Sequence, residues 1–174
     1  MGQSKLAVPF GGSTFLDRVV SAARPAFDRL IAVQRAGGTG VEGVETIFEP
    51  PRVEQAPVFG VWRALDDAKS RCFILAIDYP LLTSEVLRYL AGNGSQAEMV
   101  VPRWNGKLQM LCAIYAPSIL PRFAPRVAAG QLNLRGLTDD IEIIEEETLR
   151  ARFPGEPLMN VNTPEELRVA ARYL

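Results

Sequence analysis

The stretch FILAIDYPLLT, from Phe73 to Thr83, points to the kind of fold that this chain adopts. It belongs to the apolar run CFILAI, which has the length of a β-strand. A continuous apolar run of this length is typical of a strand that is covered on both faces, as in a parallel sheet. The run ends in Asp78, and Thr83 then has the position of an N-cap before a helix. A strand, a turn and a helix in this order predict an α/β fold.

The rest of the chain repeats this alternation of strands and helices. Its apolar spacing predicts one α/β domain over residues 1–174, with helices on both faces of a mostly parallel sheet. The Asn-Gly pair in WNGK predicts a hairpin turn between two of the strands. Strands are predicted for RLIAVQ, VETIF, EMVVPR, LQMLCAIY and DIEIIE, and helices for residues 14–24, 57–69, 83–92, 117–129 and 163–174.

The composition excludes several classes of function. The formal net charge is −1, which gives no indication of a general nucleic-acid binder or of a membrane-surface protein. No apolar run approaches the ~20 residues of a membrane span, and no signal peptide is visible. Cys72 and Cys112 lie in apolar runs, so we expect reduced core residues of a cytoplasmic protein. Because the chain has no histidine, any metal should be a hard cation held by oxygen, such as Mg²⁺.

Asp78 is the first candidate site residue. In open α/β sheets, ligands bind beyond the carboxyl ends of the strands. A carboxylate fixed at such an end can hold Mg²⁺ against a ligand phosphate, since Mg²⁺ takes one or two carboxylates besides phosphate and water oxygens. The alternative is that Asp78 caps the turn before Pro80. The position alone favours neither reading.

The segment MNVNTPEEL, residues 159–167, holds the second signal. Thr163, Pro164 and Glu166 form the pattern of an N-cap, a first helical residue and a capping box, which is purely structural. Asn160 and Asn162 lie two residues apart, so both amides point to the same side of an extended segment. They could bind a ligand or the water around a phosphate, and a plain Asx turn is the alternative.

A third signal lies at the start of the chain, in MGQSKL with PFGG behind it. A glycine followed by a lysine in a loop ahead of a helix suits the neutralisation of a phosphate. The alternative is a solvated surface charge, and the segment is no Walker A sequence.

These segments, in the order MGQSKLAVPFGG, IDYPLL, LQMLCAIY and MNVNTPEEL, resemble the molybdenum cofactor guanylyltransferase family. This family is also called molybdopterin-guanine dinucleotide biosynthesis protein A, and the resemblance covers nearly the whole chain. It implies a three-layer, Rossmann-like nucleotidyltransferase fold. It also implies an enzyme that uses Mg²⁺, transfers GMP from GTP to molybdopterin and releases pyrophosphate. Transient contact with other molybdenum cofactor proteins is implied as well.

The resemblance implies roles for individual residues. Asp78 resembles the catalytic Mg²⁺ ligand, and Lys5 resembles the lysine that contacts the nucleotide phosphates. Gly2 belongs to the same nucleotide-binding Met-Gly-x-x-Lys segment. Glu49 lies where the family usually has an aspartate near the base and ribose.

Two further segments bear on substrate choice. Asn160 and Asn162 match residues on the pterin and phosphate side of the family's site. They favour a guanylyltransferase, since related cytidylyltransferases tend to carry acidic residues there. In APVFGVWRAL, Pro57 and Gly60 match the family's Gly-Pro-Leu-x-Gly helix start, and Ala56 replaces the first glycine. A related nucleotidyltransferase that uses another base and a non-catalytic homologue stay open as alternatives.

The family usually opens with a strand and a glycine-rich loop, roughly Leu-Ala-Gly-Gly-x-Ser-x-Arg-Met-Gly. The printed sequence begins at the Met-Gly of this pattern, so we expect a domain that is truncated at its N-terminus or has a misassigned start. In the family that strand lies in the middle of the sheet. We therefore expect either two strands that face a gap or a rearranged sheet.

Overall fold

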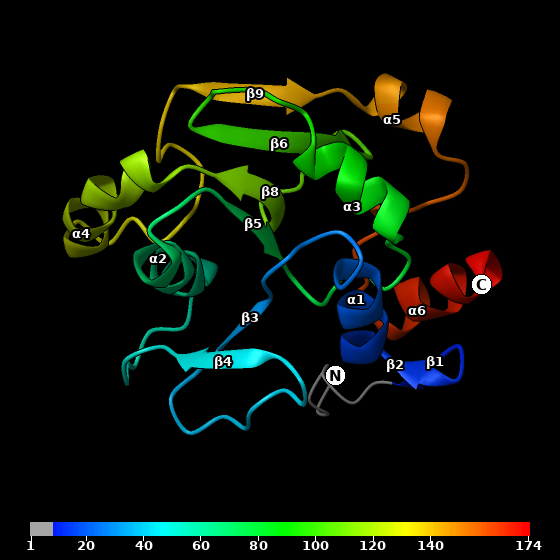
Figure 1. The fold of residues 1–174 in the computed structure, drawn as a ribbon, viewed down its shortest axis with the longest axis horizontal. Coiled ribbons are helices and arrows are strands. Elements are labelled where there is room, and N and C mark those ends of the chain that lie inside the picture. The colour runs from blue at the N-terminus through cyan, green and yellow to red at the C-terminus, as the bar shows by residue number, and fades with distance from the viewer. Residues whose placement is uncertain (1–8) are drawn as a thin grey trace.

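A computed structural model describes residues 9–174, which form an α/β fold built around three separate sheets (Figure 1). In the largest sheet the strand order is β5–β8–β6–β7, and β9 pairs with β6. Its strands are β5 (Cys72–Leu75), β6 (Met99–Trp104), β7 (Lys107–Leu108), β8 (Cys112–Tyr115) and β9 (Ile141–Ile144).

Two small sheets complete the strand content of the described chain. β3 (Ile31–Gln34) pairs in parallel with β4 (Glu45–Phe48). β1 (Pro9–Phe10) and β2 (Ser13–Thr14) form an antiparallel pair directly ahead of the first helix. Each predicted strand from RLIAVQ to DIEIIE is therefore present.

The prediction of a mostly parallel sheet is wrong for the described residues. β3 with β4 and β6 with β9 are parallel pairs, whereas β1–β2, β5–β8, β6–β7 and β6–β8 are antiparallel. The run CFILAI was expected to be covered on both faces, but all of β5 is half-buried, while all of β8 is buried. A continuous apolar run is typical of a strand in a parallel sheet, but an antiparallel strand can be apolar on both faces as well, so the run does not decide the direction of its neighbours.

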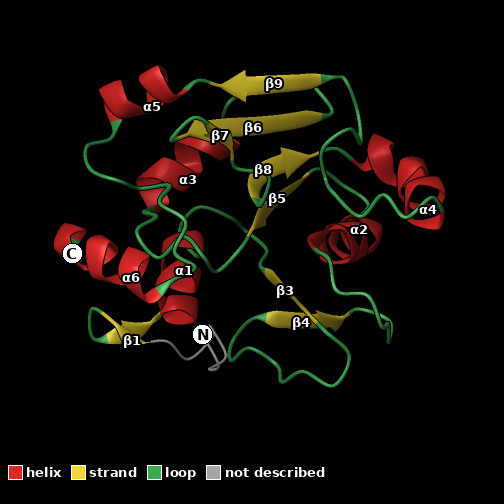
Figure 2. Ribbon diagram, turned by 180° about the vertical axis from the view of Figure 1, so that it is seen from behind, coloured by secondary structure: helices red, strands yellow, loops and turns green. Residues whose placement is uncertain are grey.

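Helices cover both faces of the largest sheet, as the sequence predicted: α1 and α3 lie on one face and α2 and α4 on the other, whereas α6 packs beside α1 and the β1–β2 pair (Figure 2). Side chains alternate along β6, so Val100 contacts the core cluster under α1 and α3, and Met99 and Val101 contact the cluster under α2 and α4. The helices are α1 (Phe15–Ala23), α2 (Pro57–Ala68), α3 (Ser84–Ala91), α4 (Leu120–Ala128), α5 (Glu146–Arg152) and α6 (Pro164–Ala170), with short 3₁₀ turns at Pro117–Ile119 and Ala171–Tyr173.

The predicted helix starts and the hairpin turn are confirmed. Thr163 and Glu166 form the expected capping box at the start of α6. Thr83 accepts a hydrogen bond from the Val86 N–H at the start of α3. In the hairpin between β6 and β7, Asn105 and Gly106 have φ angles of 49° and 69°, which the two-residue turn requires.

Two further expectations concern the cysteines and the membrane. Cys72 and Cys112 are both free thiols, as predicted, and Cys112 is buried in β8. Among residues 9–174, every helix falls short of the length and apolar character that crossing a bilayer requires.

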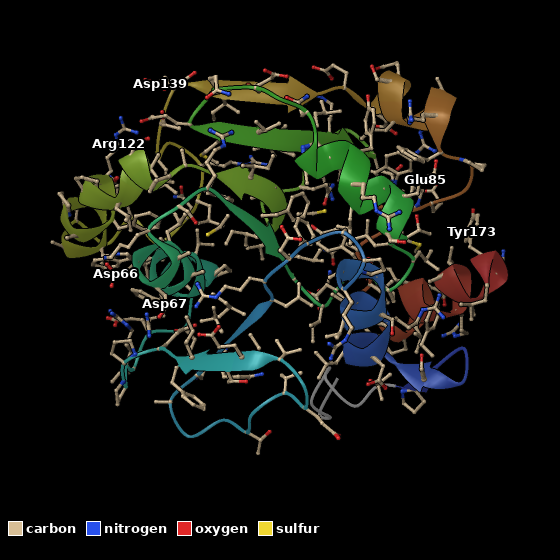
Figure 3. All side chains as sticks on the ribbon, viewed as in Figure 1. Asp66, Asp67, Glu85, Arg122, Asp139 and Tyr173 are labelled. Atoms are coloured by element: carbon tan, nitrogen blue, oxygen red, sulfur yellow. The ribbon has the colours of Figure 1, made fainter. Side chains whose placement is uncertain are left out.

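Glu98 joins the start of β6 to two other elements through its carboxylate. The carboxylate accepts hydrogen bonds from Arg122 of α4, from Thr138 and, at 2.9 Å, from the Ser118 hydroxyl. Figure 3 shows Arg122 at the same corner of the molecule as Asp139, which contributes to its electrostatic surroundings. The bond from Arg122, followed by the bond from Thr138, lowers the pKa of Glu98 to about 2.

We expect Glu98→Gln to lower the free energy of unfolding by about 1–2 kcal/mol at pH 7, because charged hydrogen bonds are worth about this much. A carboxyl group whose pKa is depressed by folding stabilises the protein above its unfolded pKa of ~4.3, and this contribution is lost as the pH falls through the folded value. The difference between variant and parent should therefore shrink between pH ~4.5 and pH ~2, measured by urea unfolding. Glu142→Gln, at an exposed position of β9, is the matched control. A difference that does not change with pH would contradict this prediction.

Candidate functional site

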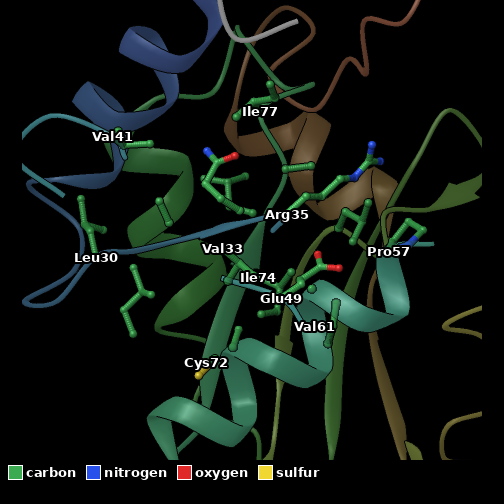
Figure 4. Close-up of a pocket in the computed structure, with 18 of the residues that line it drawn as sticks. Leu30, Val33, Arg35, Val41, Glu49, Pro57, Val61, Cys72, Ile74 and Ile77 are labelled. Carbon is green, nitrogen blue, oxygen red and sulfur yellow. The ribbon is translucent and has the colours of Figure 1, made fainter. Parts of the chain in front are cut away.

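A cavity of about 1100 Å³ lies between the β3–β4 pair and the edge of the largest sheet (Figure 4). Residues of α1, β3, α2 and β5 line it, and most of these residues are apolar. Charged side chains enter from the loops that follow β3 and β4, where Arg35, Glu49 and Arg52 also line the cavity. The cavity thus has a long apolar interior and a polar region beside the start of α2.

Glu49 is the carboxylate of this polar region. It follows directly after β4, and its backbone N–H donates to the Gln34 carbonyl at 2.8 Å, which continues the pairing of β3 with β4. A Cβ at Gly60 would lie 3.2 Å from Glu49 Oε1, so the glycine lets this carboxylate lie close against α2. Burial raises the pKa of Glu49, and the nearby Arg35 and Arg52 act in the opposite direction. A half-buried carboxylate in a cavity can accept hydrogen bonds from a ligand.

Asp78 lies in the turn that follows β5, and it is not among the residues that line the cavity. The strand ends at Leu75, so Asp78 lies three residues beyond the strand rather than at its end. Ile77, the residue before it, lines the cavity. The Asp78 carbonyl accepts a hydrogen bond of 2.8 Å from the Val161 N–H, which joins this turn to the segment ahead of α6.

This backbone bond brings together Asp78, Asn160 and Asn162, the residues from the two most specific sequence motifs. The Asn162 side-chain amide donates to Asn160 Oδ1, so the two side chains do lie on the same side of their segment. Val161 between them is fully buried and holds the segment to the core.

Tyr79, the residue after Asp78, anchors the same turn through its buried side chain. Its side chain is 2% exposed, and its hydroxyl donates to Gln109 Oε1 at 3.1 Å. Burial raises the pKa of Tyr79, and a hydrogen bond with the Asn160 side chain acts in the opposite direction. Arg18 of α1 adds a bond of 2.7 Å from Nε to the Pro80 carbonyl. The stretch from Asp78 to Pro80 is therefore held by α1, by the β7–β8 connection and by the segment ahead of α6.

The other predicted site residues are placed as follows. Glu49 reaches the cavity from β4, on a different sheet from the strand that leads to Asp78. Gly2 and Lys5 lie outside the described residues. Within residues 9–174, His, Cys, Asp and Glu side chains form no group of three or more that could hold a metal.

The sequence reasoning missed Arg35 and Arg52. Arg35 follows the apolar strand β3 directly, and this is the signal that singled out Asp78, so it could have been found. The Arg52 guanidinium lies over the Phe59 ring of α2, 4.2 Å from the ring centroid. Nothing in the loop sequence around Arg52 predicts that contact.

The sequence and the fold of this chain are similar to those of known proteins. Residues 1–144 match the MobA-like NTP transferase domain. The chain is 28% identical to a probable molybdenum cofactor guanylyltransferase of Carboxydothermus hydrogenoformans, over 94% of this chain and 85% of that protein. It is also 28% identical to a probable molybdenum cofactor guanylyltransferase of Mycobacterium avium, over 99% of this chain and 89% of that protein.

Solved structures share the fold. Molybdopterin-guanine dinucleotide biosynthesis protein A from Archaeoglobus fulgidus superposes with a TM-score of 0.80 at 22% identity, covering 98% of this chain and 90% of that one. 2-C-methyl-D-erythritol 4-phosphate cytidylyltransferase from Thermus thermophilus superposes with a TM-score of 0.69 at 14% identity, covering 97% and 92%. The α/β fold is therefore the one found in these nucleotidyltransferase structures.

Proposed function

Because this chain belongs to the MobA-like NTP transferase family, we propose that it transfers GMP from GTP to molybdopterin and releases pyrophosphate, in the cytoplasmic synthesis of the molybdenum cofactor. The match to this family confirms the resemblance seen in the sequence. The observation that carries the proposal is the bond from Val161 to Asp78, which holds the Asn160–Asn162 segment against the turn whose residue Ile77 lines the cavity. The names of the relatives from Carboxydothermus hydrogenoformans and Mycobacterium avium support GTP and molybdopterin as its substrates.

In this proposal Glu49 binds the nucleoside end of GTP. Guanine and ribose both present hydrogen-bond donors, and Glu49 is the carboxylate of the polar region of the cavity. Burial raises the pKa of Glu49, whereas Arg35 and Arg52 act against this effect and favour the charged carboxylate, which only accepts hydrogen bonds. Lys5 and the Gly2 backbone would contact the phosphates, with Lys5 acting as a point charge.

The donor atoms near Asp78 suit Mg²⁺. The carboxylate of Asp78 is a hard oxygen donor of the kind that Mg²⁺ prefers, and the amides of Asn160 and Asn162 lie on the segment that is bonded to the same turn. Since no larger acidic group is present among residues 9–174, the protein would supply few ligands, and Mg²⁺ accepts this because it keeps phosphate and water oxygens. Bound there by Asp78, the ion would neutralise the charge of the triphosphate during transfer.

The chain's own residues then act by positioning. A terminal phosphate oxygen of molybdopterin forms a bond to the α-phosphorus of GTP, and the bond from that phosphorus to the bridging oxygen of the β-phosphate breaks. The electron pair leaves with pyrophosphate. The attacking phosphate is already ionised near pH 7, so no general base is needed, in agreement with the absence of histidine. Asn160 and Asn162 would orient the acceptor phosphate through their amides.

Thermal unfolding with different nucleotides tests the proposal. We expect GTP with Mg²⁺ to raise the melting temperature of the chain and CTP with Mg²⁺ to leave it unchanged, because a ligand that binds the folded state stabilises it. An equal or larger shift with CTP would indicate a cytidylyltransferase, and no shift with either nucleotide would indicate a non-catalytic homologue. Glu49→Gln should weaken the shift given by GTP, and Glu142→Gln, on the outer strand β9, should leave it intact.

A further inference from the structure

Gln109 is the fixed end of a row of hydrogen bonds that leads to the candidate site. Its Nε2 donates to the carbonyls of Trp104 and Lys107, each at 3.0 Å, and its Oε1 accepts from the Tyr79 hydroxyl at 3.1 Å. A carbonyl oxygen only accepts hydrogen bonds. The contacts of Gln109 therefore decide how its amide is turned, because the opposite orientation would bring its oxygen against two carbonyl oxygens.

The two carbonyls that orient Gln109 belong to a hairpin that is held on its far side. Trp104 and Lys107 pair across the β6–β7 turn, and the Trp104 side chain is buried. Its indole Nε1 donates to Glu156 Oε2 at 2.9 Å, and the Arg150 guanidinium lies over its ring, 4.1 Å from the centroid. α5 and the segment after it thus hold the hairpin in place, so the Gln109 end of the row has little freedom to move.

Tyr79 passes this orientation on to Asn160. The hydroxyl of Tyr79 has one hydrogen, and it donates this hydrogen to Gln109. In the hydrogen bond between Tyr79 and the Asn160 side chain, the asparagine nitrogen must therefore be the donor. A donor at a phenol oxygen favours its charged form, and this bond does act to lower the pKa of Tyr79. The bond from the Val161 N–H to the Asp78 carbonyl holds the two segments together at this point.

The row continues from Asn160 to Asn162 in the same direction. With its nitrogen directed to Tyr79, Asn160 presents its Oδ1 on the other side, and this oxygen accepts a hydrogen bond from the Asn162 side-chain nitrogen. Each side chain of the row, from Asn162 to Gln109, thus donates towards the hairpin. Tyr79 is buried, Asn160 is half-buried and Asn162 is exposed, so the row leads from the core to the surface.

We propose that Tyr79 and Gln109 are positioning residues, which fix the orientation of the Asn160 and Asn162 amides for binding of the acceptor's terminal phosphate. In the proposed function, on which this inference rests, these two amides orient that phosphate. An amide nitrogen is a donor and an amide oxygen is an acceptor, so an amide that is turned round would present an oxygen to the anion. Amides that are already oriented also lose less conformational freedom when the acceptor binds.

The side-chain NH₂ signals of the two asparagines in NMR spectra test the row without any substrate. In Tyr79→Phe the ring stays and only the hydroxyl is lost, so the Asn160 nitrogen loses its acceptor. We expect the NH₂ signals of both Asn160 and Asn162 to move, although Asn162 is one hydrogen bond further along. Tyr115→Phe is the matched control, because it removes a hydroxyl from another buried tyrosine, which donates to the Met110 carbonyl at 2.7 Å. It should leave both asparagine signals in place.

Steady-state kinetics tests the effect on the acceptor. Tyr79→Phe should raise the KM for molybdopterin by about 10-fold, the value of one hydrogen bond, and change the KM for GTP by less than about 2-fold. Gln109→Met should have the same effect, because the Tyr79 hydroxyl can then donate to Asn160 and turn the amides round. The double variant should lie within about 2-fold of either single variant, since both changes break the same row. Tyr115→Phe should keep both KM values.

Unchanged asparagine signals in Tyr79→Phe would overturn the proposal, and so would an equal rise in the KM for GTP or effects of the two single variants that simply add. If the parent chain transfers no GMP, the proposed function fails, and a titration with inorganic phosphate takes the place of the kinetics. The asparagine signals should then report binding that is about 10-fold weaker in Tyr79→Phe than in the parent. Equal binding in the two proteins, or asparagine signals that do not respond to phosphate in the parent, would overturn the positioning role as well.

Discussion

Asp78→Asn is expected to lower the rate of nucleotidyl transfer by about 100- to 1000-fold, the usual cost of removing a charge-stabilising group from an active site. Asparagine has nearly the same shape and keeps the backbone carbonyl that binds the Val161 N–H, so the turn should stay in place. The substitution removes the negative charge that would hold Mg²⁺ against the triphosphate. The measurement is the release of pyrophosphate from GTP in the presence of Mg²⁺ and molybdopterin.

Asp139→Asn is the matched control, because Asp139 is exposed ahead of β9 and its substitution makes the same change in net charge. It should keep the parent rate, and both variants should unfold within about 1 kcal/mol of the parent. Mn²⁺-dependent binding of GTP, measured by calorimetry, gives a second readout that needs no acceptor. Parent-like turnover and parent-like Mn²⁺ dependence in Asp78→Asn would show that the metal is held elsewhere.

The ends of the helices could be predicted from the sequence because they depend on local chemistry. The Thr14 and Thr163 side chains accept from backbone N–H groups three residues on, so residues close in sequence decide where these helices begin. The turn at Asn105 and Gly106 is equally local, since both residues tolerate positive φ.

The arrangement of the strands could not be predicted in the same way. β8 lies between β5 and β6 and is antiparallel to both, and this depends on how long connections return to the sheet. Apolar composition is the same for either direction, so CFILAI was wrongly assigned to a parallel sheet. All residues of β3 and β5 line the cavity, which explains why both strands are half-buried despite their apolar sequences.

The candidate site was predicted in part. Asp78 and the Asn160–Asn162 segment were singled out separately, and the bond between Asp78 and Val161 brings them together. Tyr79 was overlooked because a buried tyrosine beside an acidic residue has no distinctive sequence pattern, and its bond to Gln109 spans 30 positions. Arg52 was overlooked for the same reason, since its stacking on Phe59 is a tertiary contact.

The largest effect on stability is expected at Phe123, which holds α4 against α2. Its side chain is fully buried, and its ring stacks on Trp62 with centroids 5.7 Å apart and an interplanar angle of 18°. Phe123→Ala removes this contact and leaves a cavity in the core, which typically costs about 3–5 kcal/mol. Since a domain of this kind is stable by about 5–15 kcal/mol, the urea midpoint should fall by a large fraction.

Val53→Ala, at a position that is 95% exposed, is the control and should change the free energy of unfolding by less than about 0.5 kcal/mol. A loss below about 1 kcal/mol in Phe123→Ala would mean that α4 does not depend on this packing, and that the cluster under α2 and α4 is held mainly by Tyr115 and its neighbours on β8.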